Sequence, residues 1–444
     1  MKSTHPGKSE AMLYQRIFWR IVPFLFLCYL AAFLDRVNVG FAKLQMAGQL
    51  GFSDAVYGFG AGIFFIGYFI FEVPSNLILE KVGAKLWIAR IMITWGIISA
   101  CMMWVETEFW FYTLRFLLGA AEAGFFPGVI LYLTYWFPAA QRCRMTALFV
   151  TAVAISNVIG APVSGFIMQF LDGVNDWQGW QWLFLLEGVP SIALGVLVLV
   201  WLPDGPRHAK WLSAPERALV LDHLAADELA KTACGSRHRF TDVFRDGRVW
   251  ALSLVYLCMM HGFYGVNFWM PTIIQEFGLD PHNYLQVGLL SMVPWGVAAV
   301  AMVLIGSHSD QTGERYWHAI VPLLVAAAGL LGLALVGHQA LLSMICLTMI
   351  TSGLLTVVAV FWSIPASFLS GTAAAAGIAW INSLGNLGGF FGPELIGRIR
   401  TATDSTEMAF FVLTGIVLLG AVVLLALKMH SETVRPAALR DTAP

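Results

Sequence analysis

Charged side chains are scarce in this sequence. Asp, Glu, Lys and Arg make up 12% of its 444 residues, whereas a soluble globular protein carries roughly 25%. Much of the solvated surface of a soluble protein is therefore missing, which excludes that class. The net charge of −1 also excludes the strongly basic balance of a nucleic-acid-binding protein, so we expect no nucleic-acid partner.

Cysteine is rare as well, and no pair of cysteines has the spacing of a metal or redox site. This pattern predicts small buried thiols in a reducing compartment. The sequence likewise lacks a phosphate-binding glycine loop, a metal-ligand cluster and a catalytic triad, so we expect no cofactor, no metal and no enzyme activity. The six cysteines are Cys28, Cys101, Cys143, Cys234, Cys258 and Cys346.

The sequence is instead rich in long runs of apolar residues. The chain is 58% hydrophobic, and its mean hydropathy is +0.73. A helix that crosses a bilayer needs about 20 mostly apolar residues. The pattern predicts an all-α membrane protein with twelve transmembrane helices, in two six-helix halves at 1–202 and 249–444 joined by a linker at 203–248. The predicted spans are 21–41, 56–79, 86–105, 109–137, 145–171, 180–202, 249–275, 284–306, 318–337, 340–363, 372–397 and 409–428.

The distribution of Lys and Arg predicts the orientation in the membrane. These residues gather in the N-terminal segment, the linker and alternate loops, whereas the remaining loops hold only Lys43, Arg398 and Arg400. Basic loops stay in the cytoplasm, so both termini and the linker are expected there. Within the linker, the amphipathic stretch Ala214–Lys231 is suited to lie along the membrane surface.

An internal repeat links the two halves. "NLILEKVGAK" follows the second predicted span and "GSHSDQTGER" follows the eighth, and both combine an acid, a glycine and a terminal base in register. The glycine permits a tight turn and the acid can meet a base or a helix N-terminus, which predicts a gating loop in each half. The alternative is ordinary loop chemistry with a chance match. The residues concerned are Glu80, Lys81, Gly83, Lys85, Asp310, Gly313 and Arg315.

Ionisable residues inside the predicted spans need an explanation, because each one costs several kcal/mol in hydrocarbon unless it is paired or hydrated. Two of them, Asp35 and Arg36, are adjacent and point about 100° apart on a helix, so they cannot readily neutralise each other. The full set is Asp35, Arg36, Glu72, Arg115, Glu122, Glu187, His261 and Glu394.

A depth estimate connects the first and fourth spans. Asp35 and Arg36 lie roughly 8–9 Å from the outer end of the first span, and Arg115 lies about 9 Å from the outer start of the fourth. Glu122 is about 10 Å deeper, on nearly the same helical face as Arg115. We therefore predict that Asp35 pairs with Arg115, that Arg36 offers its fork to a carboxylate in a cavity, and that Asp35 and Glu122 carry protons. The alternative is a purely structural lock between the two helices.

Several further polar residues are candidates for substrate binding. The amides, hydroxyls and rings of the tenth and eleventh spans could face a polar ligand, although such residues more often join helices. His261 either lines the cavity or satisfies a backbone carbonyl, and Glu72 and Glu187 are as consistent with structural hydrogen bonding as with a site. Glu394 is near the outer end of its span and is expected to reach water. The candidates are Tyr68, His261, Trp362, Ser363, Asn382 and Asn386, with Ser383 beside them.

These features together resemble the major facilitator superfamily along nearly the whole chain. The motifs "FLDRVNVGFA", "RFLLGAAEAGFFPGVILYLTYWFP", "GWQWLFLLEGVPS" and "WLPDGP" are similar to those of its anion:cation symporter branch, which includes tartrate-type and sugar-acid transporters and, further off, aromatic-acid permeases. The resemblance implies proton-driven uptake of an organic anion by alternating access, across a bacterial inner membrane. It implies that Asp35 and Glu122 carry protons, that Arg36 and Arg115 manage the substrate carboxylate, and that Tyr68 and Asn382 face the substrate.

The sequence departs from that family pattern at several positions. Phe33 replaces the tyrosine of galactonate-type relatives, which puts sugar specificity in doubt, and Asn76 and Glu80 replace the usual glycine and aspartate of the first loop motif. The loop "SFLSGTAAAAG" lacks the base that many relatives carry. An aromatic-acid permease therefore stays an alternative.

Two other functions are disfavoured by the sequence. A phosphate-exchanging antiporter is disfavoured because the seventh span has no Arg or Lys, and a membrane nutrient sensor is disfavoured because the tails are short. We expect a monomer in the lipid bilayer, with a small organic anion and H⁺ as partners.

Overall fold

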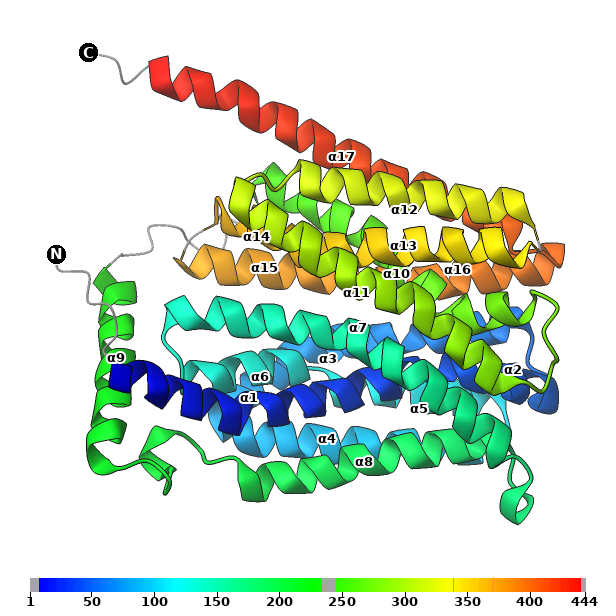
Figure 1. Ribbon diagram of the computed structural model, residues 1–444, viewed down its shortest axis with the longest axis horizontal. Coiled ribbons are helices and arrows are strands. Elements are labelled where there is room, and N and C mark those ends of the chain that lie inside the picture. Colours follow the sequence, from blue (N-terminus) through cyan, green and yellow to red (C-terminus); the bar gives the residue numbers. More distant parts are fainter. Residues whose placement is uncertain (1–7, 234–244, 338, 370, 441–444) are drawn as a thin grey trace.

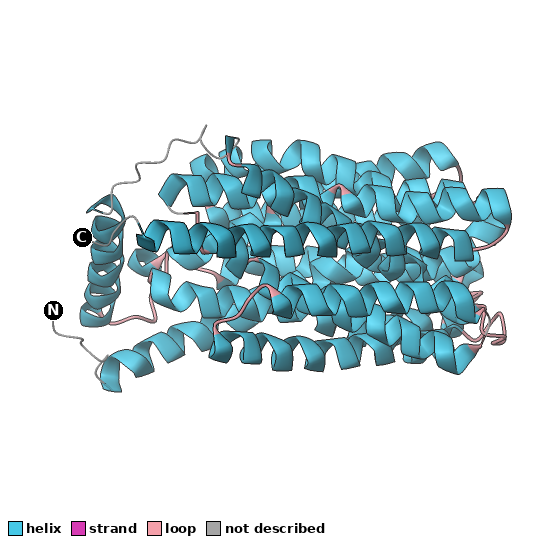
Figure 2. Ribbon diagram, turned by 90° about the horizontal axis from the view of Figure 1, so that it is seen from above, coloured by secondary structure: helices cyan, strands magenta, loops and turns pink. Residues whose placement is uncertain are grey.

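The computed structural model describes residues 8–233, 245–337, 339–369 and 371–440, and within these ranges it contains helices and no strands. Most of the helices are long and run roughly along one axis, as Figure 1 and Figure 2 show. They form two groups, one before and one after the linker, which occupy the lower and upper parts of Figure 1. The all-α membrane fold predicted from the apolar runs is confirmed.

The bounds of the helices follow the chain order. The first group consists of α1 (Lys8–Val37), α2 (Val39–Leu50), α3 (Asp54–Val82), α4 (Ala84–Cys101), α5 (Glu108–Glu122), α6 (Phe125–Thr134), α7 (Ala139–Phe170) and α8 (Gly179–Trp201), and the linker contributes α9 (Ala214–Ala233). The second group consists of α10 (Gly247–Gln275), α11 (Tyr284–Thr312), α12 (Trp317–Val336), α13 (Ala340–Phe361), α14 (Ser363–Ala366), α15 (Gly371–Asn386), α16 (Gly388–Thr403) and α17 (Glu407–Arg440).

Eleven helical segments of the described chain are long and apolar enough to cross a membrane. They coincide with eleven of the twelve predicted spans. The remaining predicted span, 372–397, is divided between α15 and α16, which meet at Leu387 and contain 16 residues each. Each piece is shorter than a membrane-spanning helix, but the two pieces together fill the predicted span.

The fourth predicted span is broken between α5 and α6. Pro127 lies inside α6, and a proline ring clashes with the carbonyl four residues before it, which is that of Ala123. The break accordingly falls at Ala123 and at Gly124, whose φ is +87°. Ser75 of α3 donates a hydrogen bond of 2.6 Å to the freed Ala123 carbonyl. The helix α5 therefore ends at Glu122, which places this acid at the break.

The amphipathic stretch predicted in the linker forms α9, which lies across one end of the bundle in Figure 1. The side chain of Arg16 in α1 donates a hydrogen bond of 2.6 Å to Glu216, and the Tyr14 hydroxyl lies 3.0 Å from Nδ1 of His223. Hydrogen bonds from Ser213 and Arg16 lower the pKa of the Glu216 carboxyl. These contacts attach α9 to the start of α1, and we call this the α9 end of the bundle. The linker residues 234–244 lie outside the described ranges.

The opposite end, which we call the Asp54 end, holds the connections from α2 to α3, α10 to α11 and α16 to α17. The two helix groups approach each other there at glycines. A Cβ atom on Gly165 of α7 would lie 2.4 Å from the carbonyl oxygen of Tyr284 in α11, and one on Gly397 of α16 would lie 2.3 Å from that of Asp54. Side chains larger than glycine would separate these backbones, so the halves are closed against each other at this end.

The described cysteines are free thiols, and Cys28, Cys258 and Cys346 are buried. This confirms the interpretation of these three as small buried side chains, whereas Cys101 is only partly buried. Cys143 and Cys234 lie outside the described side chains.

Candidate functional site

Asp35 is buried inside the first helix group. Its side chain is 1% exposed and accepts hydrogen bonds from Trp95 Nε1 at 3.1 Å, from Ser99 Oγ at 2.8 Å and from Ser191 Oγ. The donors belong to α4 and α8, so Asp35 occupies the face of α1 that packs against these two helices. Three neutral donors satisfy the carboxylate, and the predicted pairing of Asp35 with Arg115 is wrong.

Arg115 is fully buried and binds backbone carbonyls. Its Nε donates to the carbonyl of Gly60 at 3.3 Å, and its Nη2 donates to that of Ala61 at 3.2 Å. Its guanidinium carbon also lies 5.2 Å from the ring centre of Phe64. The α3 backbone therefore solvates Arg115, because that helix passes closer to its guanidinium than the carboxylate of Asp35 does.

Arg36 forms an ion pair with Glu122, so the prediction that Arg36 is free is also wrong. The side chains are 12% and 3% exposed, respectively. Arg36 Nη1 further donates a hydrogen bond of 3.1 Å to the hydroxyl of Tyr264, which lies on α10 in the second helix group. The break after α5 places Glu122 opposite α1, whereas Arg115 lies about 10 Å away along α5. The structure thus brings Arg36 and Glu122 together at the interface between the two groups.

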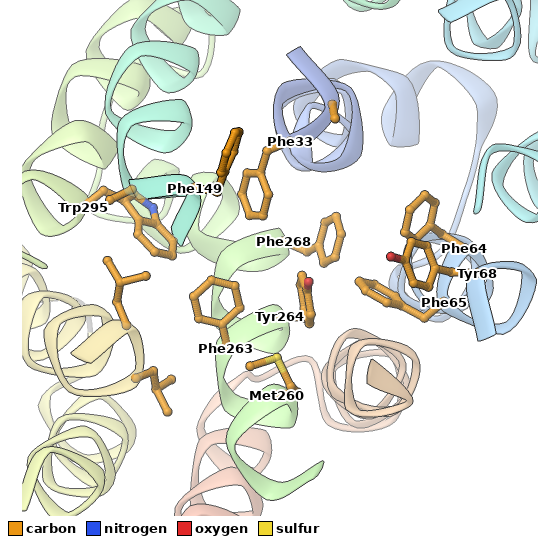
Figure 3. Packing of buried hydrophobic residues seen from close by; sticks show 14 of the residues in the cluster. Phe33, Phe64, Phe65, Tyr68, Phe149, Met260, Phe263, Tyr264, Phe268 and Trp295 are labelled. Atoms are coloured by element: carbon orange, nitrogen blue, oxygen red, sulfur yellow. The ribbon is translucent and has the colours of Figure 1, made fainter. Parts of the chain in front are cut away.

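Aromatic rings surround this ion pair. The guanidinium carbon of Arg36 lies 5.7, 5.2 and 5.5 Å from the ring centres of Phe33, Phe64 and Tyr68, respectively. Figure 3 shows these rings, together with Tyr264, reaching toward the same region from α1, α3 and α10. The rings exclude water and attract the cation, so the charges of the pair act at low dielectric. Tyr68, one of the predicted substrate-binding residues, therefore lies beside the Arg36–Glu122 pair.

Glu72 connects the two helix groups one helical turn beyond Tyr68. Its carboxylate is 6% exposed and accepts hydrogen bonds from Asn382 Nδ2 at 3.2 Å and Ser383 Oγ at 2.9 Å, both on α15. Asn382 thus comes close to the Arg36 site, but its amide is occupied by Glu72. Of the two interpretations of Glu72, the hydrogen-bonding one describes this conformation.

The remaining predicted binding residues make local contacts. His261 Nδ1 lies 2.8 Å from the carbonyl oxygen of Leu257, which is the backbone interaction named as its alternative role. Ser363 donates to the carbonyl of Val360 at 2.6 Å, and the ring centre of Trp362 lies 4.9 Å from that of Tyr256. Asn386 is partly buried in the last turn of α15, and Glu394 pairs with Arg398. These residues do not gather around Arg36 in this conformation.

The two predicted gating loops lie at the α9 end. Gly83 follows α3 with φ +94°, and Gly313 follows α11 with φ +68°, so both glycines make the tight turn that the repeat predicts. In the second loop Asp310 pairs with Arg315 at 2.6 Å, so acid and base meet within one copy. Lys85 Nζ lies 3.9 Å from Asp204 of the linker. Glu80 and Lys81 are exposed on the last turn of α3.

Four charged residues at the Asp54 end form a network that the sequence analysis missed. Asp54 accepts from Lys43 at 2.8 Å and from Arg400 at 2.7 Å, and Arg400 also pairs with Glu276. Lys43 and Asp54 belong to the first helix group, whereas Glu276 and Arg400 belong to the second. The sequence contained a signal for this network, because Lys43 and Arg400 are two of the only three bases that the sequence analysis assigned to the loops on this side. The network reinforces the closure that the glycines allow.

Comparisons with known proteins agree with this architecture. The sequence pattern described as the Major Facilitator Superfamily matches residues 25–393. A protein of Agrobacterium vitis named "Putative tartrate transporter" is 49% identical over 422 residues, which cover 95% of this chain and 92% of that protein. A protein of Pseudomonas putida named "Putative metabolite transport protein NicT" is 47% identical over 415 residues, which cover 94% of each chain. The inner membrane transport protein RhmT of Escherichia coli is 36% identical, with 93% of this chain and 94% of that protein covered.

Solved structures show the same fold at low sequence identity. A bacterial homologue of the human lysosomal transporter Spinster, in an inward-facing and occupied conformation, has a TM-score of 0.74 at 15% identity, with 91% of this chain and 96% of that chain covered. The xylose transporter XylE of Escherichia coli, in a partially occluded inward-open conformation, has a TM-score of 0.71 at 15% identity, with 92% and 97% covered. At this identity the likeness concerns the fold alone.

Proposed function

This chain belongs to the Major Facilitator Superfamily, and on that premise we propose that it is a symporter that takes up a small organic anion together with protons. Its relatives are transporters, and the chain is a multi-pass membrane transporter like them. The proposed substrate is a hydroxylated carboxylate such as tartrate or a sugar acid. The name of the Agrobacterium vitis relatives supports tartrate as the first compound to test.

The observation that carries this proposal is the Arg36–Glu122 ion pair at the interface of the two halves. A guanidinium binds one carboxylate in a fork geometry, and Glu122 occupies Arg36 in this conformation. A substrate carboxylate therefore has to take the place of Glu122 on Arg36. If Glu122 binds a proton at the same time, both acids stay compensated.

The cost of an unpaired buried charge couples substrate binding to protonation of Glu122. A charged Glu122 that lost Arg36 would be a buried, unpaired anion, at a cost of about 3–5 kcal/mol. Protonation of Glu122 removes that cost, because the acid is then neutral while the substrate pairs with Arg36. An anion and a proton therefore bind more strongly together than either does alone. Asp35, the second proposed proton carrier, is adjacent to Arg36 in the chain and lies on another face of α1.

Alternating access follows from the position of this site between the halves. In the proposed orientation the α9 end is cytoplasmic and the Asp54 end faces outside. The glycine contacts and the ion-pair network then close the outer side, and the Glu72–Asn382 hydrogen bond joins the halves on the inner side of Arg36. Outward opening has to separate Asp54 from Arg400, and release to the inside has to separate Glu72 from Asn382.

One observation favours a second candidate, an aromatic carboxylate. Phe33, Phe64 and Tyr68 surround Arg36, and their faces could stack on an aromatic ring. Uptake assays in proteoliposomes with an imposed proton gradient distinguish the candidates. Tartrate, an aldonate and phthalate should each be tested as substrate and as competitor. Uptake of tartrate or the aldonate that the gradient accelerates is the expected result. An uptake rate that does not depend on the proton gradient would contradict proton coupling. Uptake of phthalate alone would establish the second candidate.

Replacing Arg36 with lysine should weaken substrate binding about 10- to 100-fold, because a charge-assisted hydrogen bond contributes about 1.5–3 kcal/mol. Lysine keeps the positive charge but loses the planar fork that matches two carboxylate oxygens. The measurement is equilibrium binding of labelled substrate to the purified transporter. Arg398→Lys is the matched control, because Arg398 pairs with Glu394 while its side chain is 70% exposed. Unchanged affinity in Arg36→Lys would leave Arg36 with a structural role only.

A further inference from the structure

A small pocket with several polar side chains in its lining lies between the two halves, on the side of α1 away from the Arg36–Glu122 pair. It is formed by α1, the α1–α2 junction and α7 from the first half and by α10 and α11 from the second, and its volume of about 20 Å³ is enough for a water molecule. Its polar lining includes Asn38, Asn157, Ser164, Asn267 and Ser291. Because both halves contribute, separation of the halves at the Asp54 end opens this pocket toward that side.

Asn38 shows that the pocket needs a polar occupant. This residue lies at the junction of α1 and α2 and is 1% exposed. Its amide interacts with the Glu187 carboxylate, but neither its Oδ1 nor its Nδ2 makes a hydrogen bond of good geometry in the described part of the chain. A buried polar group without a partner costs about 1–3 kcal/mol. Water in the pocket would supply the missing partners.

Glu187 lies behind the wall of this pocket. It is 7% exposed, and its Oε1 accepts a hydrogen bond of 2.7 Å from Ser164, which lines the pocket. Its Oε2 is buried and makes no hydrogen bond of good geometry among the described residues, and the amide of Asn38, which lines the pocket, interacts with this carboxylate. The transport scheme built on Arg36 and Glu122 does not use Glu187, although a buried acid with an unpartnered oxygen is costly to keep in a membrane.

Glu187 is connected to Asp35 along α8. Ser191, one turn further along this helix, donates a hydrogen bond to Asp35, and residues four apart lie on the same helical face. The sequence of groups is therefore pocket, Ser164, Glu187, Ser191 and Asp35. The spacing of one turn, about 5–6 Å between Cβ atoms, is short enough for one water to bridge.

The other elements packed against α8 bring no competing free charge to Glu187 within the described chain. From α1 the facing charged group is Asp35, and α2 carries Lys43, which pairs with Asp54. From α4 the facing groups are Trp95 and Ser99, which both bond Asp35. From α7 the facing group is the Ser164 hydroxyl, and from the α1–α2 junction it is the Asn38 amide, both of which are neutral. Glu187 and Asp35 are thus neighbouring acids in a mostly neutral environment.

We propose that Glu187 is a further proton-binding site, which transfers protons between water in the pocket and Asp35. A proton from a hydronium ion in the pocket binds Oε2 of Glu187 and leaves water behind. Glu187 then releases a proton toward Asp35 through the Ser191 hydroxyl or a bridging water, each of which passes on one proton as it accepts another, and returns to carboxylate. This inference rests on the proposed proton symport, and it gives protons a route to Asp35 that is separate from the substrate site at Arg36.

Glu187→Gln tests the proposal in proteoliposomes. Glutamine keeps an oxygen that accepts the hydrogen bond from the Ser164 hydroxyl, so the local structure should be retained. Its amide cannot bind and release a proton as the carboxylate does. Net uptake driven by a proton gradient should fall about 100-fold, the lower end of the contribution of a positioned proton-transfer group. Substrate binding and substrate counterflow, which need no net proton movement, should stay close to wild type. Glu394→Gln, which removes the partner of the 70% exposed Arg398, is the control and should change neither measurement.

Three outcomes separate this inference from the proposed function. Wild-type proton-driven uptake in Glu187→Gln would overturn the proton route. Equal loss of counterflow and net uptake, in a variant that elutes normally in size-exclusion chromatography, would assign Glu187 a structural role and overturn it as well. A wild-type protein whose uptake ignores the proton gradient would overturn the proposed symport, and this inference with it.

Discussion

Replacing Glu122 with glutamine is expected to abolish proton-driven accumulation of substrate while substrate exchange continues. Glutamine has the shape of a protonated glutamic acid but never becomes an anion, so Arg36 stays available to the substrate carboxylate at every pH. Substrate binding should then lose its dependence on protonation of residue 122. The loss of the ion pair removes the penalty of about 3–5 kcal/mol that links proton and substrate in the wild type.

The measurement compares two modes of transport in the same proteoliposomes. With an imposed proton gradient, Glu122→Gln should bring the internal substrate concentration only to the external one, whereas the wild type should exceed it. In counterflow without a gradient, both should exchange labelled substrate. Glu394→Gln should behave as wild type in both assays, because Glu394 pairs with Arg398 away from the proposed site. Accumulation against a concentration gradient by Glu122→Gln would show that Glu122 is not the coupling acid.

Replacing Gly288 with valine is expected to stop transport by preventing closure at the Asp54 end. A Cβ atom at Gly288 of α11 would lie 2.3 Å from the carbonyl oxygen of Ala161 and 3.0 Å from the Cα of Pro162, both on α7. Backbone atoms cannot rotate away from such a contact, so the two helices must separate. Overpacking of this kind costs about 1–3 kcal/mol, which shifts the balance of conformations about 5- to 150-fold toward the open form.

Gly296→Val on the same helix is the matched control, since a Cβ there meets nothing within 4 Å. The conformational shift is measured with Ser156→Cys as a reporter, because Ser156 is 0% exposed and lines the pocket between the halves. A membrane-impermeant maleimide added from the Asp54 side should label this cysteine faster in Gly288→Val than in Gly296→Val. Equal labelling and equal uptake in the two variants would contradict the role of this glycine contact.

The fold was largely predictable from the sequence because its determinants are local. Length and hydropathy decide whether a run of residues can cross a bilayer, and eleven of the twelve predicted spans lie in segments of the described chain that are long and apolar enough to do so. Turn glycines are equally local, and Gly83 and Gly313 end their helices as the repeat predicted. The position of the break in the fourth span was less accessible, because it depends on the clash of Pro127 with the Ala123 carbonyl and on Ser75 from another helix.

The sequence predicted which residues form the candidate site, but it did not predict which of them contact each other. Asp35, Arg36, Arg115 and Glu122 were singled out because a charge inside a span is costly, and all four are buried or nearly so. The predicted pairings of these residues were wrong. The depth of a residue along a helix follows from counting residues, whereas the direction in which its side chain points depends on how the helix is rotated against its neighbours. Asp35 and Arg36, at almost one depth, therefore reach entirely different surroundings.

By itself, then, the amino-acid sequence determined that this protein is an all-α membrane bundle, and it identified the few polar residues that lie in its interior. Only the tertiary structure decided that Arg36 meets Glu122, that backbone carbonyls compensate Arg115, and that charges at the Asp54 end join the halves. The physical reason is that burial of a polar residue is a property of its own segment. Compensation of a buried charge belongs to whichever helix packs against it.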